Sequence, residues 1–459
     1  MSTDKNSTTR RQFLQATGGL AAASLLPGLA NAGVHGQSRD EIQVALVGSG
    51  GRGGGAAVNA VSTTSGPVKL VAMADVFEDR LSSTFGNLSK GYGDKMDVPE
   101  ERRFLGFDAY KDAMDALRPG DVVILTTPPA FRWVHYKYAI EKNLNVFMEK
   151  PVCVDGASGK RMLALNERAK TLGLKVGVGL MSRHTVGLQE LHGRIQDGEI
   201  GEILMMRGYR MHGPAATFLS LPKPPDMTDL EYQIRRFHSF IWASGGCFND
   251  FYIHHIDHLC WMKNEWPVKA QALGGRHHKE NSEGVPFVDQ NFDAYAVEYT
   301  FDDGSKFFFD GRCMVGAHGN FASYVHGTKG VAIAARAGDM GGPQAIHTGQ
   351  VMTPETEVWR STDRSNPYQN EWDVLVQKIR DDEPHNEVES GVNATLACCM
   401  GRMAAHTGQV VTFDQMINSE HELAPDVDKL TYETPSPLMP GADGRYPVPQ
   451  PGLKGNREY

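Results

Sequence analysis

The sequence predicts an α/β protein of two domains, in which a doubly wound parallel sheet precedes an α+β domain with an open, mainly antiparallel sheet. Apolar stretches alternate with helical stretches between residues 41 and 151, as expected for strands joined by crossover helices. Apolar stretches follow one another without such helices between residues 270 and 310, which favours antiparallel pairing. The chain has 459 residues, 41% of them hydrophobic, which is enough for two cores.

The first 32 residues resemble an export signal and are left out of the fold prediction. Residues 9–14 read Thr-Arg-Arg-Gln-Phe-Leu, a twin-arginine pattern, and an Ala-, Gly- and Leu-rich stretch follows. Residues 30–32 read Ala-Asn-Ala, which is typical of a cleavage site. The order of these features favours a Tat signal over a disordered basic tail. We therefore expect a protein that is periplasmic or otherwise exported.

Residues 42–75 read as a strand, a glycine-rich turn, a helix and a second strand. The turn has the G-x-G-x-x-G spacing of the Rossmann dinucleotide fingerprint, in which glycines allow the turn, the approach of a pyrophosphate and close helix packing. Asp75 ends the second strand, where an acid binds ribose hydroxyls and disfavours a 2′-phosphate. The sequence thus predicts NAD rather than NADP, and a turn without a ligand is the alternative. The predicted contacts in the turn are Gly48, Gly50, Gly51, Arg52 and Gly53.

Two further strands of this domain are predicted to end beside the cofactor. Residues 121–127 form a buried strand that runs into Thr127 and Pro128, and residues 145–148 form one that runs into Glu149 and Lys150. Helices are expected at about residues 109–117 and 133–142. Ligands of such sheets lie beyond the carboxyl ends of the strands. These four residues therefore complete the predicted cofactor site.

Acidic and imidazole side chains gather in residues 250–258. Asp250, His254 and Asp257 are spaced i, i+4, i+7, so they share one face of a helix. An imidazole one turn from a carboxylate is a plausible proton acceptor. The alternatives are a polar helix end and a zinc site that also uses His255 and His258. No H-E-x-x-H motif is present, and we predict no metal.

The chain resembles the Gfo/Idh/MocA oxidoreductases, which include inositol dehydrogenase and glucose-fructose oxidoreductase. The glycine turn, Thr127-Pro128 and Glu149-Lys150-Pro151 match consecutive landmarks of that family. Residues 245–257 are similar to its glycine pair followed by Asp-x-x-x-His-x-x-Asp, and residues 393–416 look like its closing helix and strand. The resemblance implies that Lys150 and His254 are the catalytic pair, with Asp250 as a further polar group at the substrate. Hydride then moves between a sugar carbon and the nicotinamide.

Residues 152–416 are predicted to form the second domain. Strands are expected at residues 203–210, 270–273, 294–301 and 306–310, and helices at 370–380 and 393–406; residues 338–350 read as an irregular loop. The tail, residues 417–459, is expected to wrap over the surface. Charged and aromatic groups at strand ends suit a hydroxyl-rich ligand, although surface salt bridging is the alternative. The predicted substrate contacts are Arg183, His184, Tyr209, Tyr252 and His255.

Charge and composition limit the partners. A net charge of −9 speaks against nucleic acid, and no apolar run after the signal is long enough to span a membrane. Six cysteines in a chain of this length do not form a disulfide framework, and none is given a function. A free sheet face favours a homodimer or tetramer.

Three functions are compatible with these features. The leading prediction is an exported oxidoreductase with tightly bound NAD that acts on a sugar, polyol or glycoside hydroxyl. The second is a glycoside hydrolase like those of family 109, which use bound NAD transiently and resemble this fold. An exported location without free NAD and the sequence Gly50-Gly51-Arg52-Gly53 favour the hydrolase, while the absence of its Tyr-Pro-Thr-His signature speaks against it. The third is a non-catalytic sugar-binding relative.

Overall fold

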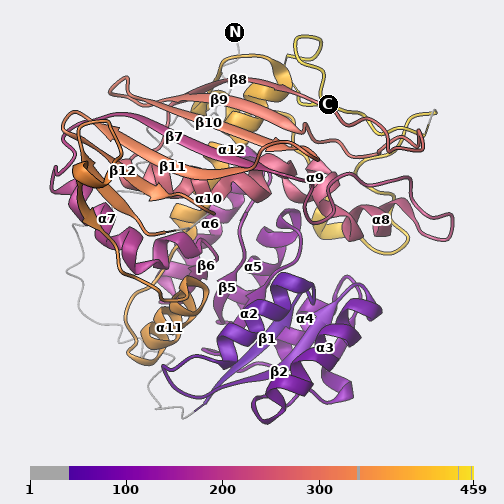
Figure 1. The fold of residues 1–459 in the computed structure, drawn as a ribbon. Helices are drawn as coiled ribbons and strands as arrows, with labels where there is room; N and C mark the ends of the chain where they lie inside the picture. Colours follow the sequence, from indigo (N-terminus) through magenta and orange to yellow (C-terminus); the bar gives the residue numbers. More distant parts are fainter. Residues whose placement is uncertain (1–40, 339–341, 443, 456) are drawn as a thin grey trace, which may run out of the picture.

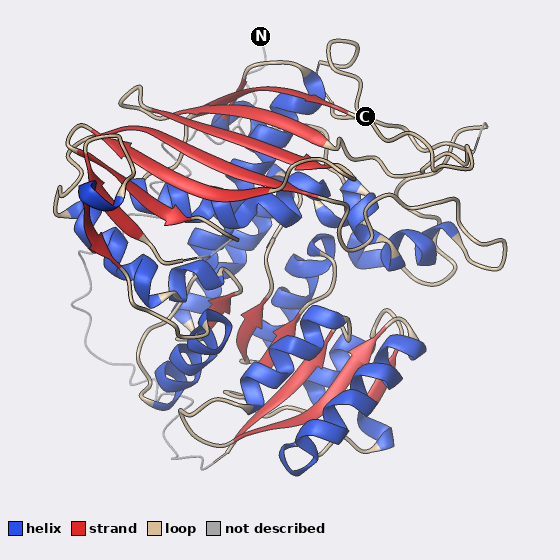
Figure 2. Cartoon of the chain, viewed as in Figure 1, coloured by secondary structure: helices blue, strands red, loops and turns tan. Residues whose placement is uncertain are grey.

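The computed structural model describes residues 41–338, 342–442, 444–455 and 457–459. The predicted export signal lies outside these residues. Within them, two sheets are stacked through a layer of helices, with the smaller sheet and its helices at the bottom of Figure 1 and the larger sheet at the top. Figure 2 shows how the helices gather between the two sheets and around the smaller one. None of the described helices combines the length and apolar character needed to cross a membrane.

The smaller sheet is the predicted Rossmann sheet. Its six strands are all parallel, in the order β3-β2-β1-β4-β5-β6, and strand order reverses between β1 and β4. Ligands bind outside the carboxyl ends of the strands at such a reversal. The sheet extends past the predicted boundary at residue 151 because β6 pairs with β5. The strands are β1 (Ile42–Val47), β2 (Val68–Asp75), β3 (Arg103–Leu105), β4 (Val122–Leu125), β5 (Asn145–Met148) and β6 (Val176–Val178).

Helices cover both faces of this sheet, as expected for βαβ crossovers. Because its strands are buried on both sides, they read as continuous apolar runs, and Val122 to Leu125 are fully buried. The helices are α2 (Gly51–Val61), α3 (Glu78–Tyr92), α4 (Ala109–Asp115), α5 (Arg132–Glu141) and α6 (Gly156–Thr171).

The larger sheet has nine strands and is mixed, mostly antiparallel. In this sheet only β7 and β10 pair in parallel, and β9 and β10 form an antiparallel hairpin beside β7. The order is β14-β13-β12-β11-β7-β10-β9-β8-β15. The strands are β7 (Ile203–His212), β8 (Lys269–Gly275), β9 (Ala294–Thr300), β10 (Lys306–Cys313), β11 (Asn320–Gly327), β12 (Gly330–Ala335), β13 (Ala345–Thr348), β14 (Glu357–Arg360) and β15 (Val411–Thr412).

One face of this sheet packs on α10 and α12, and both helices are buried around nearly their whole circumference. Successive side chains of a strand point to opposite faces of the sheet. Every second residue of β9 and β10 therefore lies on the other face, where it is exposed or only partly buried. β13 lies within residues 338–350, for which the sequence predicted an irregular loop. The remaining helices are α7 (Val186–Gln196), α8 (Asp229–Arg235), α9 (Ile241–Ser244), α10 (Gly246–Lys263), α12 (Val388–Thr407) and α13 (Phe413–Ile417).

Helix α11 (Pro367–Arg380) packs on the first domain although it lies late in the sequence, and Figure 1 shows it beside α2. Trp372 of α11 stacks near Phe147 of β5, with ring centroids 4.6 Å apart. Asp373 accepts a hydrogen bond from Thr63 at 2.6 Å, and Arg380 donates to the Pro67 carbonyl at 2.9 Å. The nucleotide-binding half is therefore completed by residues from the far end of the chain.

The last residues of the tail are buried, whereas the sequence analysis expected the tail to wrap over the surface. Glu458 is only 4% exposed and forms a two-bond ion pair with Arg402 of α12, at 2.8 and 2.9 Å. The same carboxylate lies 2.7 Å from His406 Nδ1. Burial raises the pKa of Glu458, but Arg402 and His406 outweigh burial and hold it far below the usual value. The tail is thus anchored in the core and does not simply wrap over the surface.

Candidate active site

The glycine turn has the geometry that a dinucleotide requires. Gly48 has φ +99°, and a Cβ atom on Gly53 would lie 2.0 Å from the Gly48 carbonyl oxygen, so neither position accepts a side chain. A Cβ on Gly50 would meet no atom within 4 Å, which leaves open space directly at the start of α2. The first N–H groups of a helix have no partner within the helix and favour an anion. The turn therefore fits a pyrophosphate.

Asp75 is held in place at the end of β2. Its Oδ2 accepts a hydrogen bond from Ser49 N at 2.7 Å, and its Oδ1 accepts one from Phe77 N at 2.9 Å. Burial raises the pKa of the Asp75 carboxyl, while these two N–H groups oppose the rise. Each oxygen retains lone pairs, so the fixed carboxylate can still accept bonds from ribose hydroxyls.

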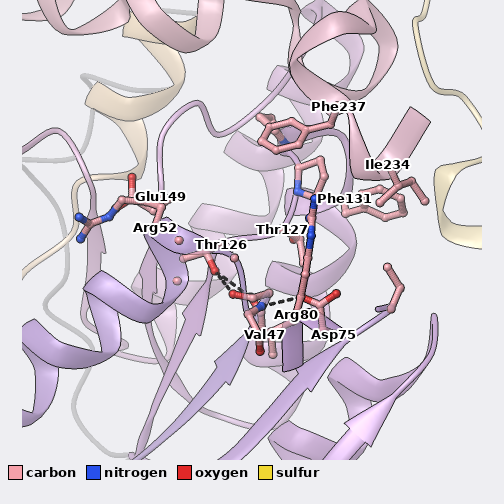
Figure 3. Close-up of a pocket in the computed structure, with 18 of the residues that line it drawn as sticks. Val47, Arg52, Asp75, Arg80, Thr126, Thr127, Phe131, Glu149, Ile234 and Phe237 are labelled. Atoms are coloured by element: carbon pink, nitrogen blue, oxygen red, sulfur yellow. Dashed lines mark hydrogen bonds and ion pairs between the residues drawn. The ribbon is translucent and has the colours of Figure 1, made fainter. Parts of the chain in front are cut away.

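A cavity of about 800 Å³ lies over the glycine turn. Ile234 and Phe237 of the second domain face Asp75 and Thr127 across it (Figure 3). The cavity therefore lies between the two domains, where both can contact a ligand. The predicted cofactor and catalytic residues that line it are Gly48, Gly50, Gly51, Arg52, Gly53, Asp75, Thr127, Pro128, Glu149, Lys150, Asp250 and His254.

Asp250 connects the predicted catalytic lysine to a histidine that the sequence analysis missed. Lys150 Nζ donates to the Asp250 carbonyl oxygen at 2.7 Å and lies 3.6 Å from its Oδ1. His238 Nε2 lies 3.2 Å from Asp250 Oδ2. The other nitrogen of this ring, Nδ1, lies 2.9 Å from the hydroxyl oxygen of Thr217. Lys150 and His238 therefore approach the same carboxylate from two sides.

The charge of Asp250 is fixed by these neighbours. Burial raises the pKa of this carboxyl, but the positive charges of Lys150 and His238, together with His254, outweigh burial and hold the pKa far below its usual value. Asp250 is thus ionised at neutral pH. A carboxylate in this state can keep an adjacent lysine or imidazole protonated, which is what proton transfer to a substrate oxygen requires.

Further residues at the cavity were also missed by sequence reasoning. Arg132 is 1% exposed and donates to the Leu125 carbonyl at 2.6 Å and to the Thr127 carbonyl at 2.9 Å. Burial lowers its pKa to about 10, so it stays charged at neutral pH. His135 Nδ1 lies 3.1 Å from the Thr127 hydroxyl, and burial and Arg132 lower the pKa of this imidazole to about 3. Together they fix the end of β4.

Arg52 links the glycine turn to β5 and α11. Its Nε donates to Glu149 at 2.7 Å, and its guanidinium lies 4.7 Å from the centre of the Tyr368 ring. Glu371, one turn beyond Tyr368, is 2% exposed, and neither of its carboxyl oxygens has a hydrogen-bond partner among the described residues. Burial and the charge of Glu149 raise the pKa of Glu371 well above its usual value, and the charge of Arg52 opposes this rise.

The structure does not bring the predicted substrate contacts to this cavity. Arg183 pairs with Asp257 at 2.7 Å and lines a separate hollow beside Trp261. His184 Nε2 lies 2.8 Å from Glu387, away from the cavity lining. Both side chains make their ion-pair contacts outside the cavity lining, at the junction between β6 and the second domain.

Tyr252 and His255 also lie outside the cavity lining. Both are fully buried in α10, where Tyr252 packs on Phe248 and Phe309. Asp250, Phe251 and His254 are the residues of α10 that line the cavity, whereas Tyr252 and His255 of the same helix are absent from its lining. Tyr209 lies in the middle of the larger sheet and is absent from the cavity lining.

The alternative metal site is not assembled by the described residues, which contain no group of three side chains suited to a metal ion. Asp257 pairs with Arg183, and His258 Nε2 lies 2.7 Å from the Ser323 hydroxyl. Although these residues are close in sequence, the structure places Asp257 and His258 in separate polar contacts.

Two family models match the chain. The oxidoreductase family, NAD-binding Rossmann fold, matches residues 42–179, and the GFO/IDH/MocA C-terminal domain matches residues 188–333. The scyllo-inositol 2-dehydrogenase (NAD(+)) of Bacillus subtilis (strain 168) is 27% identical over 270 residues, which are 58% of this chain. The match spans 65% of that relative, just under two thirds of its length.

Solved structures share the fold. The aldose-aldose oxidoreductase from Caulobacter crescentus is 16% identical with a TM-score of 0.62, over 81% of this chain and 99% of that one. The myo-inositol 2-dehydrogenase from Lactobacillus plantarum is 20% identical with a TM-score of 0.57, over 81% and 99%. The predicted NAD-binding domain and two-domain fold are confirmed, and the chain belongs to the Gfo/Idh/MocA oxidoreductase family.

Proposed function

We propose that this protein is an oxidoreductase that transfers a hydride between tightly bound NAD and a hydroxyl-bearing carbon of a sugar, polyol or glycoside. One observation carries the proposal: Lys150, Asp250 and His254 line the same cavity as the glycine turn that fits a pyrophosphate. Family membership and the inositol and aldose oxidoreductases among the similar proteins support it. NAD, when bound, supplies the hydride acceptor or donor.

The residues of this chain then handle the proton and orient the substrate. Lys150 is held at Asp250 and lines the cavity, so as an ammonium it polarises the carbonyl and donates a proton to its oxygen when the substrate is reduced. When the substrate is oxidised, the same side chain takes the hydroxyl proton as the neutral amine. His254, on the same helix face as Asp250, exchanges that proton with its surroundings. Asp250 stays ionised and holds the Lys150 ammonium in place. Phe131, Phe237 and Phe251 give the cavity an apolar wall on which a substrate can pack.

A glycosidase that oxidises, eliminates, adds water and reduces is the second candidate. It needs separate groups for the hydroxyl proton and for the proton of the adjacent carbon. His238 and His254 both lie beside Asp250, so the cavity offers two imidazoles and a lysine. This observation, with Arg52 in the glycine turn, keeps that function as the alternative.

One experiment separates the two. Purified protein is incubated without added cofactor, first with aryl glycosides and then with inositols and free aldoses. Lasting formation of bound NADH from a polyol or sugar supports the oxidoreductase, whereas release of the phenol without a lasting change in NADH absorbance supports the glycosidase. A holoprotein that does neither with any of these substrates contradicts both.

We further propose that the protein is exported by the Tat route and is a homo-oligomer. The twin-arginine pattern supports the first statement, and it is tested by fractionating cells that express the wild type or Arg10→Lys/Arg11→Lys. Accumulation of both in the cytoplasm would contradict it. The open face of the larger sheet, with Leu204 56% exposed and Leu273 78% exposed, supports a dimer or tetramer. Light scattering of a monomer at micromolar concentration would contradict it.

A further inference from the structure

The segment that follows Asp75 is bound by α8, which lies outside the nucleotide-binding domain. Arg235, at the end of α8, forms two parallel bonds with Asp79, each 2.8 Å long. These bonds, opposed by burial, lower the pKa of Asp79 to about 2. Arg80 Nη2 donates to the carbonyl oxygen of Arg235 at 2.8 Å. The contact thus runs in both directions between α8 and the start of α3.

A second contact comes from the tail. The Tyr432 hydroxyl donates to the Val76 carbonyl oxygen at 2.8 Å, and its ring packs edge-on against Phe107 at 5.1 Å. Val76 and Phe107 both line the large cavity. The guanidinium of Arg235 lies 4.1 Å from the centre of the Phe77 ring, which adds an aromatic contact in the same place.

These contacts lie where the adenosine of a dinucleotide binds. An acid at the position of Asp75 binds the ribose hydroxyls, and Val76, Phe77 and Asp79 directly after it line the same cavity. Ile234 and Phe237, which flank Arg235 in sequence, line the cavity opposite Asp75 (Figure 3). The second domain therefore reaches across the adenosine end of the groove.

The two contacts are joined behind the groove. Gln233 of α8 donates to the Leu438 carbonyl at 2.8 Å, and Trp242 donates to Gln233 at 2.6 Å. Leu230 and Leu430 belong to one apolar cluster, which also contains Phe77 and Phe131 of the first domain. We call α8 together with residues 430–434 the strap.

We propose that the strap closes the adenosine end of the site and retains the dinucleotide between turnovers, with Arg235 and Tyr432 acting as positioning residues through Asp79 and Val76. This inference rests on the proposed function, because it assumes that the groove holds NAD. It goes beyond that function by assigning cofactor retention to residues outside the nucleotide-binding domain.

The test measures release of the dinucleotide and needs no substrate. The purified full chain is loaded with NADH, an excess of NAD is added, and the loss of bound-NADH fluorescence gives the dissociation rate. Arg235→Ala and Tyr432→Phe are each expected to raise that rate about two- to fivefold, and the double variant about tenfold, since partly exposed contacts of this kind are weak one by one. Lys429→Ala is the matched control, because Lys429 forms only an exposed pair with Asp426 in the same tail.

The outcomes separate the inference from the function. If the double variant releases NADH faster than the wild type, and Lys429→Ala releases it at the wild-type rate, the result supports the proposed role of the strap. Unchanged release in a double variant that still binds NADH overturns the inference and leaves the proposed function standing. A lower melting temperature of the nucleotide-free variants with unchanged release shows a merely structural contact and also overturns it. A wild type that binds neither NAD nor NADH overturns both proposals.

Discussion

Replacing Lys150 by methionine is the sharpest test of the proposed chemistry. Methionine keeps most of the apolar length of the side chain but removes the ammonium that lies 2.7 Å from the Asp250 carbonyl and 3.6 Å from its carboxylate. A positioned proton-transfer group contributes roughly 10²- to 10⁴-fold to a rate. We therefore expect turnover to fall by about that factor. The pKa of Asp250 should rise as well, because burial raises it and Lys150 is the largest effect in the opposite direction.

The assay is single-turnover formation of NADH on the holoprotein with the best polyol or sugar found, so that product release does not hide the chemical step. Lys137→Met is the control, since Lys137 forms only an exposed pair with Glu141 on α5. NADH retention should be unchanged in both variants, because the glycine turn is intact. If Lys150→Met keeps turnover within threefold of the wild type while binding NADH normally, Lys150 has no part in the chemistry.

Three further predictions follow from the same structure. In His238→Ala, Asp250 loses the imidazole that lies 3.2 Å from its Oδ2, so the pKa of Asp250 should rise and the acid limb of the kcat/KM profile should move to higher pH; an unmoved limb would show that His238 does not act on Asp250. In Gly53→Ala, the new methyl group would lie 2.0 Å from a carbonyl oxygen, and NADH fluorescence titration should show loss of binding at micromolar protein. In Glu458→Gln, Arg402 keeps a buried charge without its partner, which costs about 3–5 kcal/mol and should lower the melting temperature by at least about 5 °C. Because the pKa of Glu458 is depressed on folding, this difference should be complete at neutral pH and shrink as the pH falls below the ordinary value of 4.5; a difference that grows in acid would contradict the ion-pair account.

The nucleotide-binding half could be predicted in detail because each signal there is local. A buried parallel strand is a short apolar run, so β5 has the bounds expected from sequence, and the glycine turn and Lys150 follow at the strand ends. The family resemblance supplied His254 and Asp250, and both line the cavity.

The substrate side could not be predicted in the same way. Because α10 is buried all round, helical spacing does not separate its cavity-facing side chains from those that face the core, and Tyr252 and His255 of this helix lie outside the cavity lining. His238 was missed because nothing in the sequence near it signals that Asp250, twelve positions later, will be its partner. Tyr368 approaches Arg52 from α11, a contact that no local pattern encodes.

The position of α11 has a consequence for how the protein is made. The ribosome releases β1 to β6 long before residues 367–380, yet Phe147, Pro67 and Thr63 find their partners on that helix. During synthesis the nucleotide-binding half therefore keeps an uncovered apolar face until more than four-fifths of the chain has emerged. We infer that a fragment cut after β6 will aggregate, and that cofactor capture is a late event in biogenesis.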